Sequence, residues 1–148
     1  MTTAEIVIRC NNKSIIIHVG CDGYPSHTGE EILNIFSRYD RFSDLETFIS
    51  ECEIYTIECN KFNEITRDDN NLLEYDLKTF LLYLNSIGKV IDFYNPPKEW
   101  QDEADFTYIV DLNLEKILFY KKDVLFLEVD FDNIEFHYDY DKLLEKIK

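Results

Sequence analysis

The sequence predicts a single α+β domain, with an N-terminal β-hairpin, central helices, a C-terminal antiparallel β-meander and a short terminal helix. Three observations carry this prediction. Two β-branched runs lie near the N-terminus, apolar residues at helical spacing follow, and alternating runs fill the last third. Separate groups of strands and helices are typical of the α+β class. A chain of 148 residues fits one domain, 1–148.

The first two runs, Glu5–Cys10 and Lys13–Val19, are rich in isoleucine and valine. Asn11 and Asn12 separate them and predict a two-residue hairpin turn, because asparagine tolerates positive φ. Apolar residues occupy both faces of the second run, which predicts a central strand covered on both sides.

A polar turn follows this strand, and we interpret it as structural. Glycine permits positive φ or a close backbone approach, an aspartate caps backbone amides, and the residue before proline is extended. Thr28 is the predicted N-cap of a helix over about 29–38, with Glu30 and Glu31 complementing its dipole. The turn residues are Gly20, Asp22, Gly23, Tyr24 and Pro25.

The middle of the chain alternates between helical and extended patterns. Ser43 and Glu46 form a capping-box pattern that predicts a short second helix with Ser43 as its cap. Ile54–Cys59 and Val90–Tyr94 are strand-like, and leucines at helical spacing predict a helix over about 75–86.

The last third is rich in strands. Phe106–Leu112, Lys116–Tyr120 and Val124–Phe131 alternate between apolar and polar residues, and Ile134–Tyr138 is predicted as a fourth short strand. Asp139 or Asp141 is expected to begin the terminal helix.

The composition constrains the partners. Thirty acidic and fifteen basic residues give a formal net charge of −15 and a pI near 4.4. Binding of nucleic acid requires cations that replace counterions, so direct contact with nucleic acid is not expected, nor with an anionic membrane surface. The same field attracts a basic protein, including one that itself binds nucleic acid. The oligomeric state has no signature in the sequence.

The predicted location is the cytoplasm of a host cell. The N-terminal residues lack a basic region followed by an apolar core, and no apolar run approaches about 18 residues. No cysteine pair has the two-residue gap of a zinc knuckle, so neither a metal nor a cofactor is predicted. The four thiols, expected to be reduced, are Cys10, Cys21, Cys52 and Cys59.

The aromatic and acidic C-terminal segment is the predicted partner-binding surface. Regularly spaced carboxylates on a rigid sheet would imitate a phosphate backbone, and neighbouring aromatics would anchor a protein interface. The alternative is a solvated acidic face of an amphipathic strand pair. The predicted contact residues are Glu128, Asp130, Asp132, Glu135, Phe136, Tyr138, Asp139 and Asp141.

Catalysis at the polar turn is the alternative site. Cys21 would be the nucleophile, with His18 and Asp22 as partners and His27 nearby. A catalytic cysteine needs a base within hydrogen-bonding reach. Two histidines and Asp22 would also suit Zn²⁺ or Fe²⁺, but their spacing matches no established metal motif. Phosphate binding by the glycines is excluded, because no Lys or Arg lies between His18 and Leu33.

The run I-H-V-G-C-D-G-Y-P at 17–25, followed by Gly29 and Leu33, resembles a group of small phage and bacterial proteins. Their pattern is H-x-x-D-G-Y-P after an apolar strand, and D-F-T-Y-I-V-D at 105–111 resembles their later strand pair. Here Cys21 replaces an aromatic residue, and His18 is displaced by one position. The group has no established activity, so the resemblance implies a virus or mobile element as the source.

The sequence therefore predicts an acidic, non-enzymatic, protein-binding inhibitor from a phage or mobile element. It would mimic nucleic acid and act against host defence, as an anti-CRISPR protein does. Two alternatives stay open: a hydrolase or transferase centred on Cys21, and a bacterial immunity or antitoxin protein.

Overall fold

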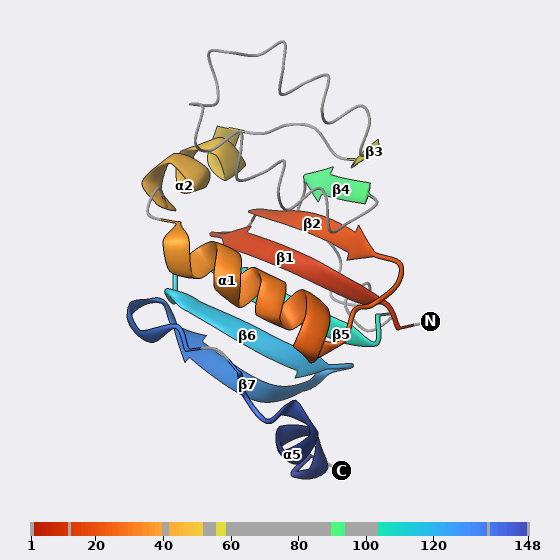
Figure 1. Cartoon of the computed structure of the whole chain (residues 1–148). Coiled ribbons are helices and arrows are strands. Elements are labelled where there is room, and N and C mark those ends of the chain that lie inside the picture. The colour runs from red at the N-terminus through yellow and green to blue at the C-terminus, as the bar shows by residue number, and fades with distance from the viewer. Residues whose placement is uncertain are drawn as a thin grey trace.

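The fold is built on one seven-stranded mixed sheet whose strands lie in the order β3-β4-β2-β1-β5-β6-β7 (Figure 1). The structure is a computed structural model that describes residues 2–11, 13–39, 42–51, 56–58, 90–93, 104–135 and 137–147. Helix α1 crosses one face of the sheet, and the C-terminal helix α5 lies beyond the β7 edge (Figure 1).

The elements have the following bounds. The strands are β1 (Ala4–Cys10), β2 (Lys13–Val19), β3 (Thr56–Glu58), β4 (Val90–Phe93), β5 (Phe106–Asp111), β6 (Lys116–Lys121) and β7 (Val124–Asp130). The helices are α1 (Glu30–Arg38), α2 (Phe42–Glu51) and α5 (Tyr140–Glu145), with a π-helical turn η1 (Pro25–Gly29) and a 3₁₀ turn η3 (Phe131–Asn133).

A parallel pairing joins the two ends of the chain. Strands β1 and β2 form the N-terminal hairpin, and β5, β6 and β7 form an antiparallel meander. Strand β1 pairs with β5 in parallel, with Ile6 opposite Tyr108. Because this contact spans about a hundred residues, the loop it closes carries an entropic cost that burial of both strands must offset.

The main core lies between the sheet and α1. Ile32, Leu33 and Phe36 recur at helical spacing, and all three are buried against the sheet. Burying a side chain of this size stabilises the fold by roughly 1.5–3 kcal/mol. Helix α2 adds Leu45 and Ile49 to the same core.

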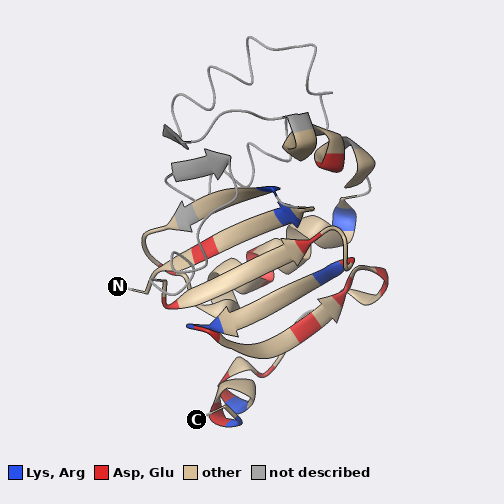
Figure 2. Cartoon of the chain, turned by 180° about the vertical axis from the view of Figure 1, so that it is seen from behind, with Lys and Arg blue, Asp and Glu red and all other residues tan. Residues whose placement is uncertain are grey.

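A second, smaller apolar cluster lies on the opposite face of the sheet. Val7, Ile16, Ile109 and Leu118 are buried there, and Tyr120 packs against them. None of the helices in the described part of the chain covers this face (Figure 2). Strand β2 is therefore buried on both faces, as its sequence predicts.

The α+β class, the hairpin, the meander and the terminal helix are confirmed. The predicted strand at Ile134–Tyr138 is wrong, because the described residues of that segment form no ladder. The second helix is confirmed as α2, but Ser43 lies inside it and does not cap it, since α2 begins at Phe42. The helix predicted over 75–86 lies outside the described residues.

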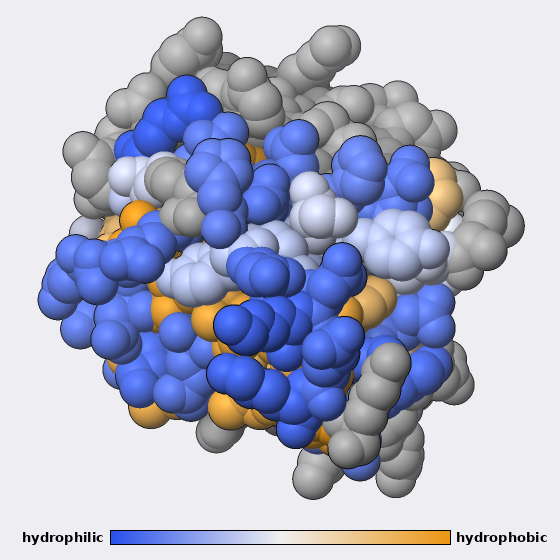
Figure 3. Space-filling model, turned by 60° about the horizontal axis from the view of Figure 1, so that its bottom comes forward, coloured by the Kyte–Doolittle hydropathy of each residue, from blue (hydrophilic) through white to orange (hydrophobic). Residues whose placement is uncertain are grey.

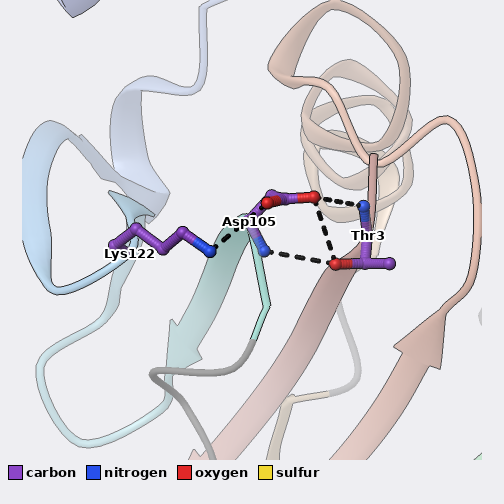
Figure 4. A network of polar contacts seen from close by, with 3 residues as sticks. All are labelled: Thr3, Asp105 and Lys122. Atoms are coloured by element: carbon purple, nitrogen blue, oxygen red, sulfur yellow. Dashed lines mark hydrogen bonds and ion pairs between the residues drawn. The ribbon is translucent and has the colours of Figure 1, made fainter. Parts of the chain in front are cut away.

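A polar network joins the starts of β1 and β5 to the β6–β7 turn (Figure 4). Asp105 Oδ2 accepts hydrogen bonds from the Thr3 amide at 2.9 Å and from the Thr3 hydroxyl at 3.3 Å. The Lys122 ammonium lies 3.3 Å from Asp105 Oδ1. The Thr3 amide, and after it Lys122, hold the pKa of the Asp105 carboxyl below its usual value.

Asp105→Asn is expected to destabilise the fold at neutral pH by less than about 1 kcal/mol, because the carboxylate is 42% exposed and solvent screens it. A lowered folded-state pKa means that this stability is present above the unfolded pKa of about 3.9 and is lost as the pH falls further. The difference between Asp105→Asn and the wild type should therefore shrink below about pH 4 in urea titrations. Asp123→Asn, in the same turn as Lys122, is the control, and an equal effect there would contradict the assignment.

Candidate functional site

Gly23 anchors the polar turn to the central strands β1 and β5. Its amide donates to the Thr2 carbonyl at 3.0 Å, and its carbonyl accepts a 2.6 Å bond from the Tyr108 hydroxyl. A Cβ at this position would lie 2.7 Å from the Thr3 carbonyl carbon and 2.8 Å from the Ala4 Cβ. The turn thus approaches β1 more closely than any side chain at position 23 allows.

The turn also sets where α1 begins. A Cβ on Gly29 would lie 2.7 Å from the Phe119 ring, so α1 meets the sheet through a glycine. The left-handed residue is Asp22, at φ 58°, and no described glycine has a positive φ. Of the two roles expected for the glycines, close backbone approach is therefore the one that the described turn uses, and positive φ is not.

Two predicted caps are wrong. Gly29, in place of Thr28, precedes the first residue of α1. The Thr28 hydroxyl donates to the Asp22 carbonyl at 2.8 Å, which closes the turn on itself. Among the described residues, none donates a hydrogen bond to the Asp22 carboxylate, so it caps no amide there. The backbone groups of Asp22 and Gly23, and not the Asp22 side chain, make the bonds that hold the turn.

The predicted nucleophile, Cys21, makes no hydrogen bond to His27 in the described part of the chain. Cys21 is exposed with a free thiol. His18 lies on β2 opposite Glu5. The described residues contain no group of three or more His, Cys, Asp or Glu side chains that could hold a metal ion.

Only two of the predicted contact acids lie on the sheet. Glu128 and Asp130 project from β7, the last strand in the sheet order, with side chains 50% and 66% exposed. Lys116 lies between them, 3.7 Å from the Glu128 carboxylate and 3.9 Å from that of Asp130. One lysine thus offsets part of their charge.

The other predicted acids follow β7 along the chain. Asp132 and Glu135 are exposed, in η3 and just after it. Asp141 is exposed in the first turn of α5, and the Asp139 carboxylate caps that helix by accepting a 3.1 Å bond from the Lys142 amide. Acidic residues accordingly concentrate along β7 and the chain after it (Figure 2).

The predicted aromatic anchors are not shown to be exposed. Tyr138 is half-buried and packs against the core beside Tyr140, and Phe136 lies outside the described residues. The exposed apolar residues of β7 are Val124 and Leu125, 42% and 38% exposed, which the sequence analysis did not single out. The lower end of the molecule in Figure 1 is mainly hydrophilic, with apolar atoms between the polar groups (Figure 3).

A pocket of about 410 Å³ lies at the start of α1. The sequence did not predict a binding site around Glu30 and Glu31. Its lining combines η1 and α1 with one residue from just before α5. His137 Nδ1 lies 3.8 Å from Glu30 Oε1, and the Glu30 side chain is 31% exposed. Cys21 is not part of the lining. The lining residues are Ser26, His27, Glu30, Glu31, Asn34 and His137.

A carboxylate of this pocket influences the pKa of a buried tyrosine. Tyr140 is 7% exposed, stacks on Phe119, and its hydroxyl has no hydrogen-bond partner among the described residues. Burial raises the pKa of Tyr140, and the charge of Glu30 raises it further. The hydroxyl is therefore within electrostatic range of a carboxylate of the pocket.

Among the described residues, no helix has the length and apolarity that crossing a bilayer requires. No protein-family model matches the chain, and comparisons with curated proteins and with solved structures found no match. The arrangement of the described residues is thus the basis for any functional conclusion.

Proposed function

We propose that the chain is a non-enzymatic inhibitor that binds a basic host protein through the acidic segment from β7 to α5. The observation that carries this proposal is charge density on one edge of the sheet. Between Asp123 and Glu145 the chain has eight acidic residues and a single lysine, Lys142. All eight acids are exposed, and they lie in the turn before β7, in β7, in η3, in the segment after η3 and in α5.

Such a surface suits a partner that itself binds nucleic acid. Exposed carboxylates steer a basic groove into contact and make association sensitive to salt. Val124 and Leu125 add exposed apolar area next to the charges, which the core of an interface needs. A counter-defence inhibitor of the anti-CRISPR type and an immunity or antitoxin protein share these physical requirements and differ in the partner.

The rival reading, a hydrolase or transferase using Cys21, has less support. A nucleophilic cysteine needs a base within hydrogen-bonding reach and a place for the substrate. Cys21 is exposed and does not line the described pocket.

Neutralising three acids of the segment is expected to weaken partner capture at least about tenfold at 50 mM salt, because each removes part of the steering field. The variant is Glu128→Gln/Asp132→Asn/Glu135→Gln. The measurement is retention of a purified basic DNA-binding protein of the host, and competition with duplex DNA for it, at 50 and 500 mM salt. Retention should fall sharply at the higher salt.

The matched control removes three charges outside this segment, as Asp22→Asn/Glu46→Gln/Glu115→Gln. Equal losses in both variants would show that net charge alone matters and would contradict a local surface. If the wild type retains none of a panel of basic nucleic-acid-binding proteins at 50 mM salt, the proposed function is wrong.

A further inference from the structure

We infer that the pocket at the start of α1 receives an arginine side chain of the basic partner, an inference that rests on the proposed function. Side chains from two distant parts of the sequence, residues 26–34 and His137, line this pocket. Its 410 Å³ lies within the range of about 300–1,000 Å³ that ligand sites occupy.

The charge of the lining favours a cation. Glu30 and Glu31 are acidic, and the lining contains no Lys or Arg. The dipole at the start of α1 opposes a cation with about half a unit of positive charge, which is less than the two carboxylates contribute. The nearest described base on α1 is Arg38, and it is already bound to Asn34 Oδ1 at 2.6 Å.

Arginine fits these acceptors better than lysine does. Its planar group carries five donors that match two carboxylates and the Ser26 hydroxyl, and guanidinium planes stack on flat rings such as imidazole. The histidines His27 and His137 supply two such rings in the lining. Glu30 is two-thirds buried, so its bond to a guanidinium is screened less than a bond on the open surface.

His137 already places a ring nitrogen near Glu30. Its Nδ1 lies 3.8 Å from Glu30 Oε1, and its backbone is held in the left-handed region at φ 64°. The Tyr140 hydroxyl has no partner among the described residues, and after burial the charge of Glu30 also raises its pKa. The chain thus surrounds Glu30 with polar groups while leaving open space in front of it.

The test uses the full chain and a defined probe. N-acetyl-arginine amide is titrated at pH 7.5 against the ¹⁵N-labelled protein, and N-acetyl-citrulline amide serves as the uncharged isostere. The arginine probe should cause saturable shifts at the amides of residues 26–34 and 137, with an affinity on the order of millimolar. The citrulline probe should cause smaller shifts that do not saturate.

Glu30→Gln/Glu31→Gln should weaken the arginine shifts about tenfold, because it replaces charge-assisted hydrogen bonds with neutral ones. Asp22→Asn/Glu115→Gln removes the same charge outside the pocket and should leave the arginine shifts as in the wild type. Equal shifts with citrulline, shifts centred elsewhere, stronger shifts with a lysine amide, or no change in Glu30→Gln/Glu31→Gln would each overturn the inference.

Failure of this inference can be distinguished from failure of the proposed function. If the wild type and Glu30→Gln/Glu31→Gln retain a basic partner equally well, the pocket is not the anchor, and the proposed function stands. If the wild type retains no basic protein, the proposed function fails, and with it the assignment of the arginine to a partner.

Discussion

Gly23→Ala is expected to lower the free energy of unfolding by about 1–3 kcal/mol or more, because its Cβ would overlap atoms that cannot rotate away. The new atom would lie 2.7 Å from the Thr3 carbonyl carbon, and the backbone of β1 would have to shift. That shift would also strain the 3.0 Å bond from the Gly23 amide to Thr2. Urea and thermal unfolding measure the loss.

Two neighbours of Gly23 serve as controls. Cys21 and Ser26 are exposed on either side, so Cys21→Ser and Ser26→Ala should change stability by less than about 0.5 kcal/mol. Wild-type stability in Gly23→Ala would mean that the turn is not packed against β1. A Cys21→Ser protein that is stable and retains its partner would remove the main argument for a thiol nucleophile.

Tyr108→Phe is expected to cost about 1–3 kcal/mol, since it leaves the Gly23 carbonyl without the hydroxyl that binds it at 2.6 Å. Tyr108 is fully buried, so the vacated carbonyl cannot recover its bond from bulk water. Burial also raises the pKa of Tyr108, so the hydroxyl stays a donor across the neutral range. The loss should appear in the urea midpoint with little change in slope.

Tyr140→Phe is the matched comparison. It removes the same atom from another buried tyrosine, whose hydroxyl has no partner among the described residues. Removing an unpartnered buried hydroxyl should be neutral or slightly stabilising. If the two variants lose equal stability, the bond from Tyr108 to Gly23 does not account for the effect of Tyr108→Phe.

Gly23→Ala and Tyr108→Phe should both affect the pocket, because both disturb the contact between Tyr108 and Gly23. The Tyr108–Gly23 bond fixes the turn, and the turn places Ser26 and His27 at the mouth of the pocket. A variant that loosens this contact should reduce arginine binding even though it removes no charge. The acidic segment on β7 is separated from this contact by β6 and should be affected less.

Local patterns in the sequence were sufficient to predict most elements. Isoleucine-rich runs predicted β1 and β2, and alternation predicted β5, β6 and β7, because each pattern reports which side chains are buried. The same reasoning failed at Ile134–Tyr138. Strand β6 begins at Lys116, which already pairs with Asp130, so a continuing strand would have no partner, and Phe131 instead stacks on Phe42 at 4.7 Å.

Local sequence patterns account for one part of the pocket lining and not for the other. Helical spacing places four of the lining residues on one face: His27, Glu30, Glu31 and Asn34. The sequence alone is therefore enough to group these four. The contribution of His137, more than a hundred residues away, was not available.

The sequence by itself determined the fold class, the positions of most strands and helices, and a strongly negative charge, since these depend on local periodicity and composition. The tertiary structure decided the parallel pairing of β1 with β5, the bond from Tyr108 to Gly23 and the approach of His137 to Glu30. Contacts of this kind depend on strand register. Strands that are apolar on both faces bury their side chains equally well in several registers, so their pattern alone does not select one.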